Sequence, residues 1–310
     1  MNTEYPKVAQ TREEHIALMK SRGLIINDEQ LALHYLRYIS YFRLTGYVKS
    51  FTDKNDQFHD KTKFEDIINL YNFDRKLRLL CLDAIERIEI ALRSTMINCV
   101  AVSNGAFWHL DNKNFSNTEE HQRIIDHIKR QISKSNDLFI EKHNTKHQDI
   151  DHPCWMAFEV ISLGTLSQIY AFMFSKKRKE VADKFGLNPN TFESWIRAIS
   201  YTRNLCAHHS RVWNRIFVRQ PTFSKNLYKE SFYIDNEPKN NRFFAQAIVI
   251  QALLSKLVPE TQWTLNLNEL LEEFPNINKK SMGFPDDWKS RPPFAEYFVE
   301  SNVQPISAEQ

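Results

Sequence analysis

The stretch from Phe64 to Val102 contains neither glycine nor proline. Along it, side chains suited to a core recur at steps of three and four residues, the spacing of one face of an α-helix. These positions are Leu70, Phe73, Leu77, Leu80, Ala84, Ile88, Ala91 and Thr95. The sequence therefore predicts one long amphipathic helix, which ends at Asn104-Gly105 because glycine permits the left-handed conformation that follows many helices.

Glycine is scarce in the whole chain, with six glycines and eleven prolines in 310 residues. A sheet-rich fold needs many turns, and these residues supply them. Hydrophobic residues make up 42% of the chain and aromatic residues 13%, which is enough to fill a sizeable core. The predicted fold class is all-α.

Shorter helical segments flank the long helix, and polar residues with capping preferences open them. The predicted helices run over Thr11–Gly23, over Asp28–Ile39 with Leu31, Tyr35, Tyr38 and Ile39 as its apolar face, over Thr118–Lys134, from the capping box Asn190–Glu193 onward, and over Asn241–Leu257 before a Pro-rich end. A helical hairpin over Trp155–Phe174 is broken at Gly164, and polar connections cover Phe51–Lys63 and Ser135–Pro153. We expect an N-terminal helical segment (1–63), a helical bundle (64–220) and a C-terminal helical extension (221–310).

Cysteine spacing and hydropathy indicate the compartment. The four cysteines are widely spaced and form no Cys-x-x-Cys pair, so they predict neither a disulfide framework nor a zinc ribbon. The N-terminus has no apolar leader core, and no stretch approaches eighteen uninterrupted apolar residues. We expect a cytoplasmic protein with no membrane partner.

Positive charge is concentrated in one region, although the formal net charge is only +3. Seven basic residues and no acidic residue occur between positions 197 and 229, namely Arg197, Arg203, Arg211, Arg215, Arg219, Lys225 and Lys229. Such a field can hold phosphates. Aromatic residues that could stack on unpaired bases alternate with them, namely Tyr201, Trp213, Phe217, Phe223 and Tyr228. The alternative is a solvated basic face with its aromatic residues in the core.

The helix predicted from Asn190 places two stripes of residues in this region. The first stripe is apolar and contains Trp195, Ile199, Thr202, Cys206, His209 and Trp213. The second contains Asn204, His208, Arg211 and Arg215. This phase predicts that His209 faces the core and that His208 is presented among polar and cationic side chains.

Arg203, Asn204 and His208 suit the chemistry of RNA cleavage. RNA supplies its own 2′-hydroxyl as nucleophile, so a protein needs a proton acceptor, a proton donor and a cation for the phosphate. Histidine titrates near neutrality, and the arginine fork binds phosphate in two places. We expect His208 to act as acid or base, Arg203 to bind the phosphate and Asn204 to orient His208, without metal or cofactor. Flanking RNA contacts are predicted at Arg211, Arg215, Arg197 and Arg219. The alternative is an ordinary exposed histidine and an ion-pairing arginine.

The segment Arg203–Arg215 resembles the signature of the Abi family, the AbiD/AbiF-like abortive-infection proteins, and its core matches the Arg-x4-6-His motif of HEPN ribonucleases. The likeness extends from Leu18 to about Arg215 through motifs at Arg22–Leu24, Tyr38–Tyr47, Leu70–Arg78, Ile85–Arg93, Leu163–Ser167 and Ser194–Trp195. It implies a HEPN-like helical bundle with additional N- and C-terminal helices, and a phage-defence or toxin module. It further implies metal-independent RNA cleavage by a homodimer, and a protein or RNA antitoxin is a candidate partner.

Three further hypotheses accompany this reading. Glu86, Glu89 and Arg93 on the long helix are predicted to support the site by facing the Arg203 helix, the alternative being surface ion pairs. His143, His147, His152 and Cys154 have ligand-like spacing, but their polar surroundings indicate a loop, so no metal site is predicted. The rival function is a non-catalytic helical module that binds RNA or a protein through the same basic face.

Overall fold

A computed structural model describes residues 8–148, 150–223, 227–234 and 237–298. The described residues are mostly helical, and their one sheet pairs strand β1 (Tyr233–Ile234) with strand β2 (Glu237–Pro238) in antiparallel fashion. The all-α prediction is confirmed. Among the described helices, none has the length and apolar character needed to cross a membrane.

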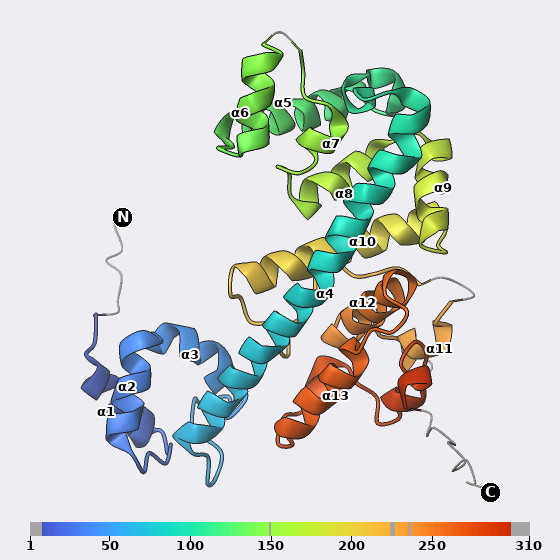
Figure 1. Cartoon of the computed structure of the whole chain (residues 1–310). Coiled ribbons are helices and arrows are strands. Elements are labelled where there is room, and N and C mark those ends of the chain that lie inside the picture. Colours follow the sequence, from blue (N-terminus) through green and yellow to red (C-terminus); the bar gives the residue numbers. More distant parts are fainter. Residues whose placement is uncertain (1–7, 149, 224–226, 235–236, 299–310) are drawn as a thin grey trace, which may run out of the picture. The chain divides into compact units, whose positions relative to one another are not determined.

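The α-helices follow one another along the chain, and the longest described connections lie between α3 and α4 and between α10 and α11 (Figure 1). They are α1 (Arg12–Ser21), α2 (Glu29–Tyr38), α3 (Tyr41–Val48), α4 (Phe64–Asn104), α5 (Thr118–Lys134), α6 (Leu138–Lys146), α7 (Cys154–Ala157), α8 (Leu163–Phe172), α9 (Ser175–Lys184), α10 (Pro189–Ala207), α11 (Lys229–Phe232), α12 (Phe243–Leu257) and α13 (Trp263–Glu273). Short 3-10 helices lie at Trp108–Leu110, Asn112–Asn114, Lys280–Met282, Trp288–Ser290 and Ala295–Tyr297.

The chain divides into two compact units. Unit one contains the residues up to Leu77 together with Leu270–Ile277. Unit two contains the described residues of Arg78–Glu269 and those from Asn278 to residue 298. The boundaries predicted at residues 63 and 220 stay predictions.

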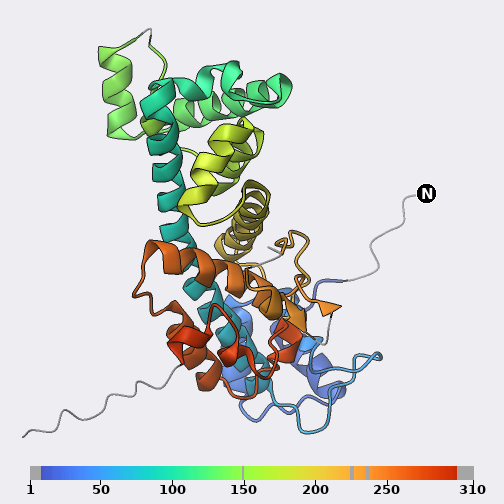
Figure 2. The same ribbon diagram turned by 90° about the vertical axis from the view of Figure 1, so that its right-hand side faces the viewer.

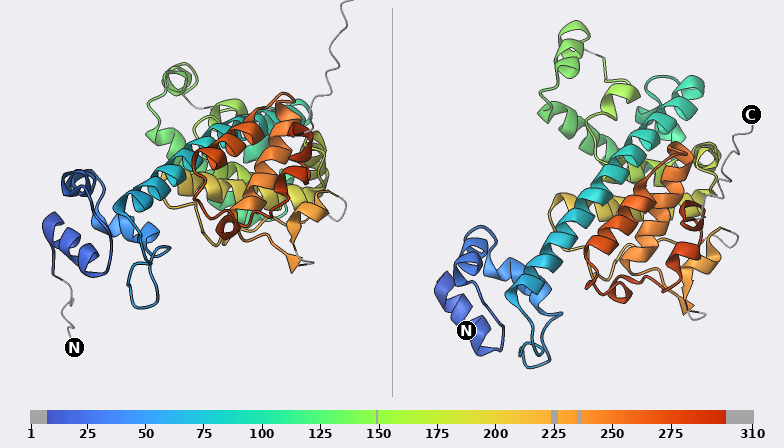
Figure 3. Two further views of the ribbon diagram at one scale, coloured as in Figure 1. Left: turned by 90° about the horizontal axis from the view of Figure 1, so that it is seen from below. Right: turned by 60° about the horizontal axis from the view of Figure 1, so that its bottom comes forward.

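In unit one, α1 and α2 pack against each other, as the blue helices of Figure 3 show. The capping box predicted at Thr11 is present, and the side chain of Asp28 caps α2. The predicted apolar face of α2 is wrong, since Tyr38 is 73% exposed and the buried residues are Ala32 and Leu36. The small Ala32 permits close helix contact. The buried face was not predicted, because the larger apolar residues around Ala32 indicated another face of the helix. In the same unit the buried Tyr47 hydroxyl donates to Asp74 at 2.7 Å.

In unit two, α10 packs against α8, α9 and α12, which can be followed in Figure 2. Helix α12 is apolar around its whole circumference and its first twelve residues are buried, as expected for a core helix. Its two buried glutamines are paired, because Thr202 Oγ1 donates to Gln246 and Thr264 Oγ1 donates to Gln251. The amides of these two glutamines are therefore satisfied inside the core against which the motif helix packs.

Several predicted boundaries differ from the structure. Helix α6 lies in part of the segment that was predicted to be a polar connection. It was not predicted from the sequence, because Ile140 is its one buried residue and its apolar residues show only a weak helical period. The hairpin breaks between Ala157 and Leu163 instead of at Gly164, since the Ser162 side chain caps α8. Helix α10 begins at Pro189, after an Asn188 cap, and not at the predicted capping box. Helix α13 lies in the stretch after Leu257, where the C-terminal helical extension was predicted only as a Pro-rich end with no helix bounds.

Candidate functional site

The helix α10 carries the Arg203 motif and is fixed at its N-terminus. Asn188 accepts a hydrogen bond from the Thr191 amide at 2.9 Å, and Pro189 occupies the first helical position, where its missing N–H costs nothing. Trp195, Ile199 and Cys206 are buried along one side, as the first stripe predicted. The backbone before the motif is therefore held rigidly in the core of unit two.

The C-terminus of α10 lies inside the motif. The Ser210 amide donates to the Leu205 carbonyl at 2.8 Å, and the His209 amide donates to the Cys206 carbonyl at 3.0 Å. These are the two bonds of a Schellman motif, and His209 takes its left-handed position with φ 56°. Since the helix ends at Ala207, the helical phase does not reach His209. The prediction that His209 faces the core is wrong, and both His208 and His209 are exposed.

The three predicted catalytic residues lie at this helix end, in its last turns and at its C-cap. Arg203 is half-buried, whereas Asn204 and His208 are exposed. The Arg203 Nη1 atom lies 3.5 Å from Asn204 Oδ1, and the His208 amide donates to the Asn204 carbonyl at 3.0 Å. The predicted bond from the Asn204 side chain to the imidazole does not occur among the described side chains. Asn204 instead lies beside the guanidinium.

The chain after α10 turns back along the helix. The rings of Tyr201 and Phe217 lie 6.2 Å apart, and the Thr222 amide donates to Ser194 Oγ at 2.8 Å. Trp195 Nε1 donates to the Thr222 carbonyl at 3.0 Å. Residues late in this segment therefore lie beside residues early in α10, and the segment runs antiparallel to the helix.

This return brings together arginines that helical spacing cannot. Arg211 and Arg215 were predicted on a helical stripe with His208, but they lie in the returning segment, where Arg215 Nη1 donates to the Arg211 carbonyl at 3.0 Å. Arg197 and Arg219 line one cavity of about 500 Å³ next to Ser194. Arg197 also pairs with Glu193 at 2.9 Å. Residue spacing did not identify Ser194, Gln220 and Thr222, which line the same cavity, because no spacing rule relates a helix to a returning loop.

The aromatic residues of the basic region are mostly not available to bases. Trp213 and Phe217 are buried, and the Tyr201 ring packs against Phe217. Trp213 and Phe217 therefore fit the alternative, in which the aromatic residues of the basic region lie in the core. Lys225, which belongs to the same basic region, lies outside the described residues.

The charges on α4 bind a neighbouring segment instead of α10. Arg93 contacts Glu89 at 3.3 Å, Glu159 at 3.4 Å and the Ile161 carbonyl at 3.4 Å. The Arg93 and Glu89 side chains are only 13% and 15% exposed, so they are more than a surface ion pair. Glu86 is exposed and forms no ion pair within the described part of the chain.

Arg93 nevertheless acts close to the motif through the segment it holds. Ile161 precedes Gly164, and a methyl group added at Gly164 would lie 3.5 Å from Ser200 Oγ on α10. Ser200 stands one helical turn before Arg203 and Asn204. Helix α8 therefore packs on α10 at ordinary van der Waals distance at position 164, and Arg93 binds the backbone just before α8.

The side-chain rings of three histidines lie close together in and after α6. The His143 ring centroid lies 5.2 Å from that of His147 and 4.4 Å from that of His152. Burial and the nearby His143 lower the pKa of His152 below its usual value. Within the described ranges, no three His, Cys, Asp or Glu side chains are placed to hold a metal ion, and Asp149 lies outside those ranges.

Comparison with known proteins gives one match. A family model described as Abi-like protein matches residues 34–214, which include α3, α4 and α10 with the whole Arg203–Asn214 segment. No curated protein and no solved structure matches the chain.

Proposed function

The chain belongs to the Abi-like family, whose membership supports a role in abortive infection, and we propose that it performs this role by cutting RNA without a metal ion. The observation that carries the proposal is the end of α10, where an arginine and an exposed histidine stand five positions apart on a backbone fixed by a Schellman motif. The phage-defence role follows from the family. The cleavage chemistry is our inference from the residues.

His208 would move protons in the reaction. Its imidazole is exposed, so it can reach an RNA backbone, and an imidazole near neutrality can accept the 2′-hydroxyl proton or donate to the leaving 5′-oxygen. The Schellman motif supports this role, because it fixes the backbone on both sides of His208. No metal-bound water is needed in this scheme.

Arg203 would bind the phosphate as its negative charge grows. A guanidinium donates two parallel hydrogen bonds to phosphate oxygens and remains charged at every relevant pH. The 3.5 Å contact with Asn204 supports a role for this amide in positioning Arg203 in place of His208. Asn204 would thus limit the rotamers of the guanidinium and leave its remaining donors for RNA.

The returning segment would hold the RNA on either side of the cut. Arg197 and Arg219 line a common cavity, and Arg211 and Arg215 follow the motif directly. The distance along α10 from Arg197 to His208 is about 16 Å at the usual helical rise. Such a strip of cations suits a few nucleotides of single-stranded backbone.

Two subunits would complete the catalytic site. In-line cleavage uses a base on one side of the phosphate and an acid on the other, but the motif offers one His208 per chain. A two-fold axis beside the end of α10 would bring two copies together, in an interface where each face meets its own image. A protein or RNA antitoxin would restrain such an activity by covering this face.

The test incubates end-labelled single-stranded RNA with the protein in excess chelator and identifies the product ends. We expect 2′,3′-cyclic phosphate ends, and a loss of at least about 100-fold in rate for His208→Ala and for Arg203→Gln. His59→Ala is the matched control, because His59 is an exposed histidine of unit one. Binding without cleavage by the wild-type protein would instead identify the non-catalytic module.

A further inference from the structure

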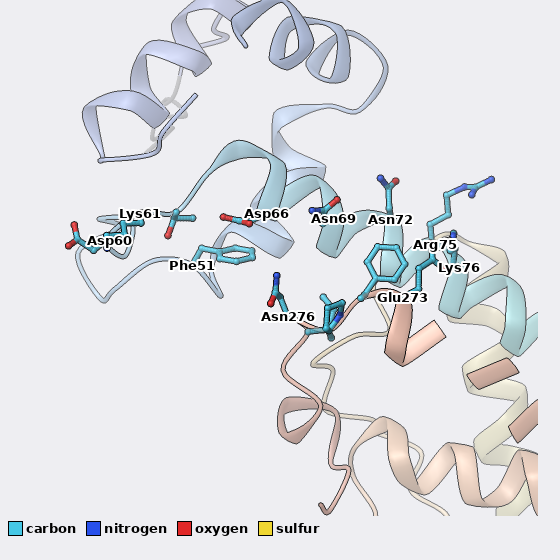
Figure 4. Close-up of a pocket in the computed structure, with 14 residues that line it drawn as sticks. Phe51, Asp60, Lys61, Asp66, Asn69, Asn72, Arg75, Lys76, Glu273 and Asn276 are labelled. Carbon is cyan, nitrogen blue, oxygen red and sulfur yellow. Dashed lines mark hydrogen bonds and ion pairs between the residues drawn. The ribbon is translucent and has the colours of Figure 1, made fainter. Parts of the chain in front are cut away.

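Unit one contains a cavity of about 680 Å³ that the proposed cleavage reaction does not use. It lies between the first turns of α4 and the segment that follows α13, and Phe51 and Lys61 complete its wall. Figure 4 shows Asp66, Asn69, Asn72 and Arg75 following one another along α4, with Asn276 on the opposite side. The volume falls in the range that encloses small organic ligands.

The amides of this cavity are free to bind a ligand. Within the described residues, the side chains of Asn69, Asn72 and Asn276 form no hydrogen bond to protein. Each amide carries both a donor and an acceptor, so it can match the edge of a heterocyclic base. Asn69 and Asn276 are exposed and Asn72 is half-exposed, so these three amides can reach a ligand in the cavity.

Carboxylate and aromatic groups stand beside these amides. Asp66 accepts from the Lys63 amide at 2.8 Å through one oxygen, which leaves its second oxygen for a ligand. That oxygen would accept from an exocyclic amino group. Phe51 is half-buried, and its ring makes no ring–ring contact with any other described residue. An apolar ring in this position can stack on a base.

The cationic end of the cavity lies farther along α4. Lys76 is already engaged, because it pairs with Glu273 and lies 5.4 Å from the Phe274 ring centroid. Arg75 is exposed and forms no ion pair within the part of the chain that the structure describes. Amide and carboxylate groups therefore precede an unpaired guanidinium along one helix.

We propose that this cavity binds a nucleotide whose base carries an exocyclic amino group. The base stacks on Phe51 and pairs with Asn69, Asn276 and Asp66, and the phosphate binds Arg75. Uracil fits less well, because it has no amino group for Asp66. The ligand is either a free nucleotide or an unpaired nucleotide within an RNA chain, and both sources share this chemistry.

The experiment measures binding to full-length His208→Ala protein by titration calorimetry, so that no ligand is consumed by cleavage. The ligands are AMP, UMP, adenosine and single-stranded oligoadenylate. We expect AMP to bind more tightly than UMP. Arg75→Gln should weaken AMP binding about tenfold, as loss of a charged hydrogen bond does, and leave adenosine binding unchanged. Asn276→Ala should weaken both ligands.

Arg87→Gln is the matched control, because Arg87 is an exposed arginine of the same helix that pairs with Asp83 outside the cavity. Tight binding of the oligonucleotide alone, lost in Arg75→Gln and Asn276→Ala, supports the site and assigns it to RNA. Absence of binding by all four ligands at millimolar concentration overturns the proposal, as does binding that neither variant changes. The proposed cleavage reaction stands or falls separately, since it is measured on the wild-type protein with labelled RNA.

Discussion

The Ser210 amide donates to the Leu205 carbonyl at 2.8 Å and closes α10 with His209 held in a left-handed conformation between them. Glycine usually occupies this position, because a Cβ atom is strained at positive φ. Strained residues of this kind gather at functional sites. The placement of His209 is therefore a second reason to assign function to the end of α10.

We expect His209→Gly to raise the free energy of unfolding by about 0.5–1 kcal/mol, because glycine relieves the strain at φ 56°. Urea denaturation measures the change. His208→Gly is the control, since His208 has φ −88° and gains no relief. A lower stability of His209→Gly would show that contacts of the imidazole outweigh the backbone strain.

Gly283 is the position where an added methyl group fits worst. Its φ is 85°, and a Cβ atom there would lie 2.7 Å from Cβ of Arg242, next to α12. We expect Gly283→Ala to lower the free energy of unfolding by about 2 kcal/mol or more, since strain and a backbone-anchored clash add. Gly46→Ala in α3 has open space and should be neutral or stabilising by up to about 1 kcal/mol. Equal effects in thermal denaturation would contradict this reading of both positions.

The interiors of α4 and α5 were predictable from the sequence, whereas the end of α10 was not. The long helix, its end at Gly105 and the span Thr118–Lys134 follow from periodicity and caps, and the structure confirms them. The end of α10 depends on a histidine in a position that glycine normally occupies, so the local sequence did not predict where the helix ends.

The partners of the site charges were also beyond sequence reasoning. Arg93 binds Glu89, which lies one helical turn away and was foreseeable, but also the Ile161 carbonyl, which carries no side-chain signal. Arg197 and Arg219 were both predicted as phosphate ligands, yet the cavity they share arises because Phe217–Thr222 returns along α10. Such pairings are set by tertiary packing, not by residue spacing.

His109 makes stability depend on pH. Burial lowers the pKa of this imidazole from 6.5 to about 4, so below pH 6.5 the unfolded chain binds a proton that the folded protein does not. The contribution is fully present above pH 6.5 and is lost as the pH falls toward 4. We expect the loss of this contribution to lower the free energy of unfolding by about 2 kcal/mol between pH 7 and pH 5. Urea titrations at the two pH values should show a difference that is smaller in His109→Phe, which keeps a ring against Phe158. His59→Phe, at an exposed position, should keep the full difference.

The proposed two-subunit site predicts that His208→Ala protein poisons the wild type. A mixed dimer contains one His208 in place of two, so it lacks either the base or the acid. When equal amounts of the two proteins are mixed and allowed to exchange, about a quarter of the dimers are wild-type pairs. The rate of RNA cleavage should then fall to about a quarter of the rate of the same total amount of wild-type protein. Mixing wild-type protein with His59→Ala protein should leave the cleavage rate unchanged at the same total amount of protein, because both chains of every dimer keep His208. A rate that falls only to half, as it does for independent subunits, would show that one chain holds a complete site. Light scattering with and without a non-cleavable RNA then decides whether dimers form only on RNA, as the repulsion between two basic faces leads us to expect.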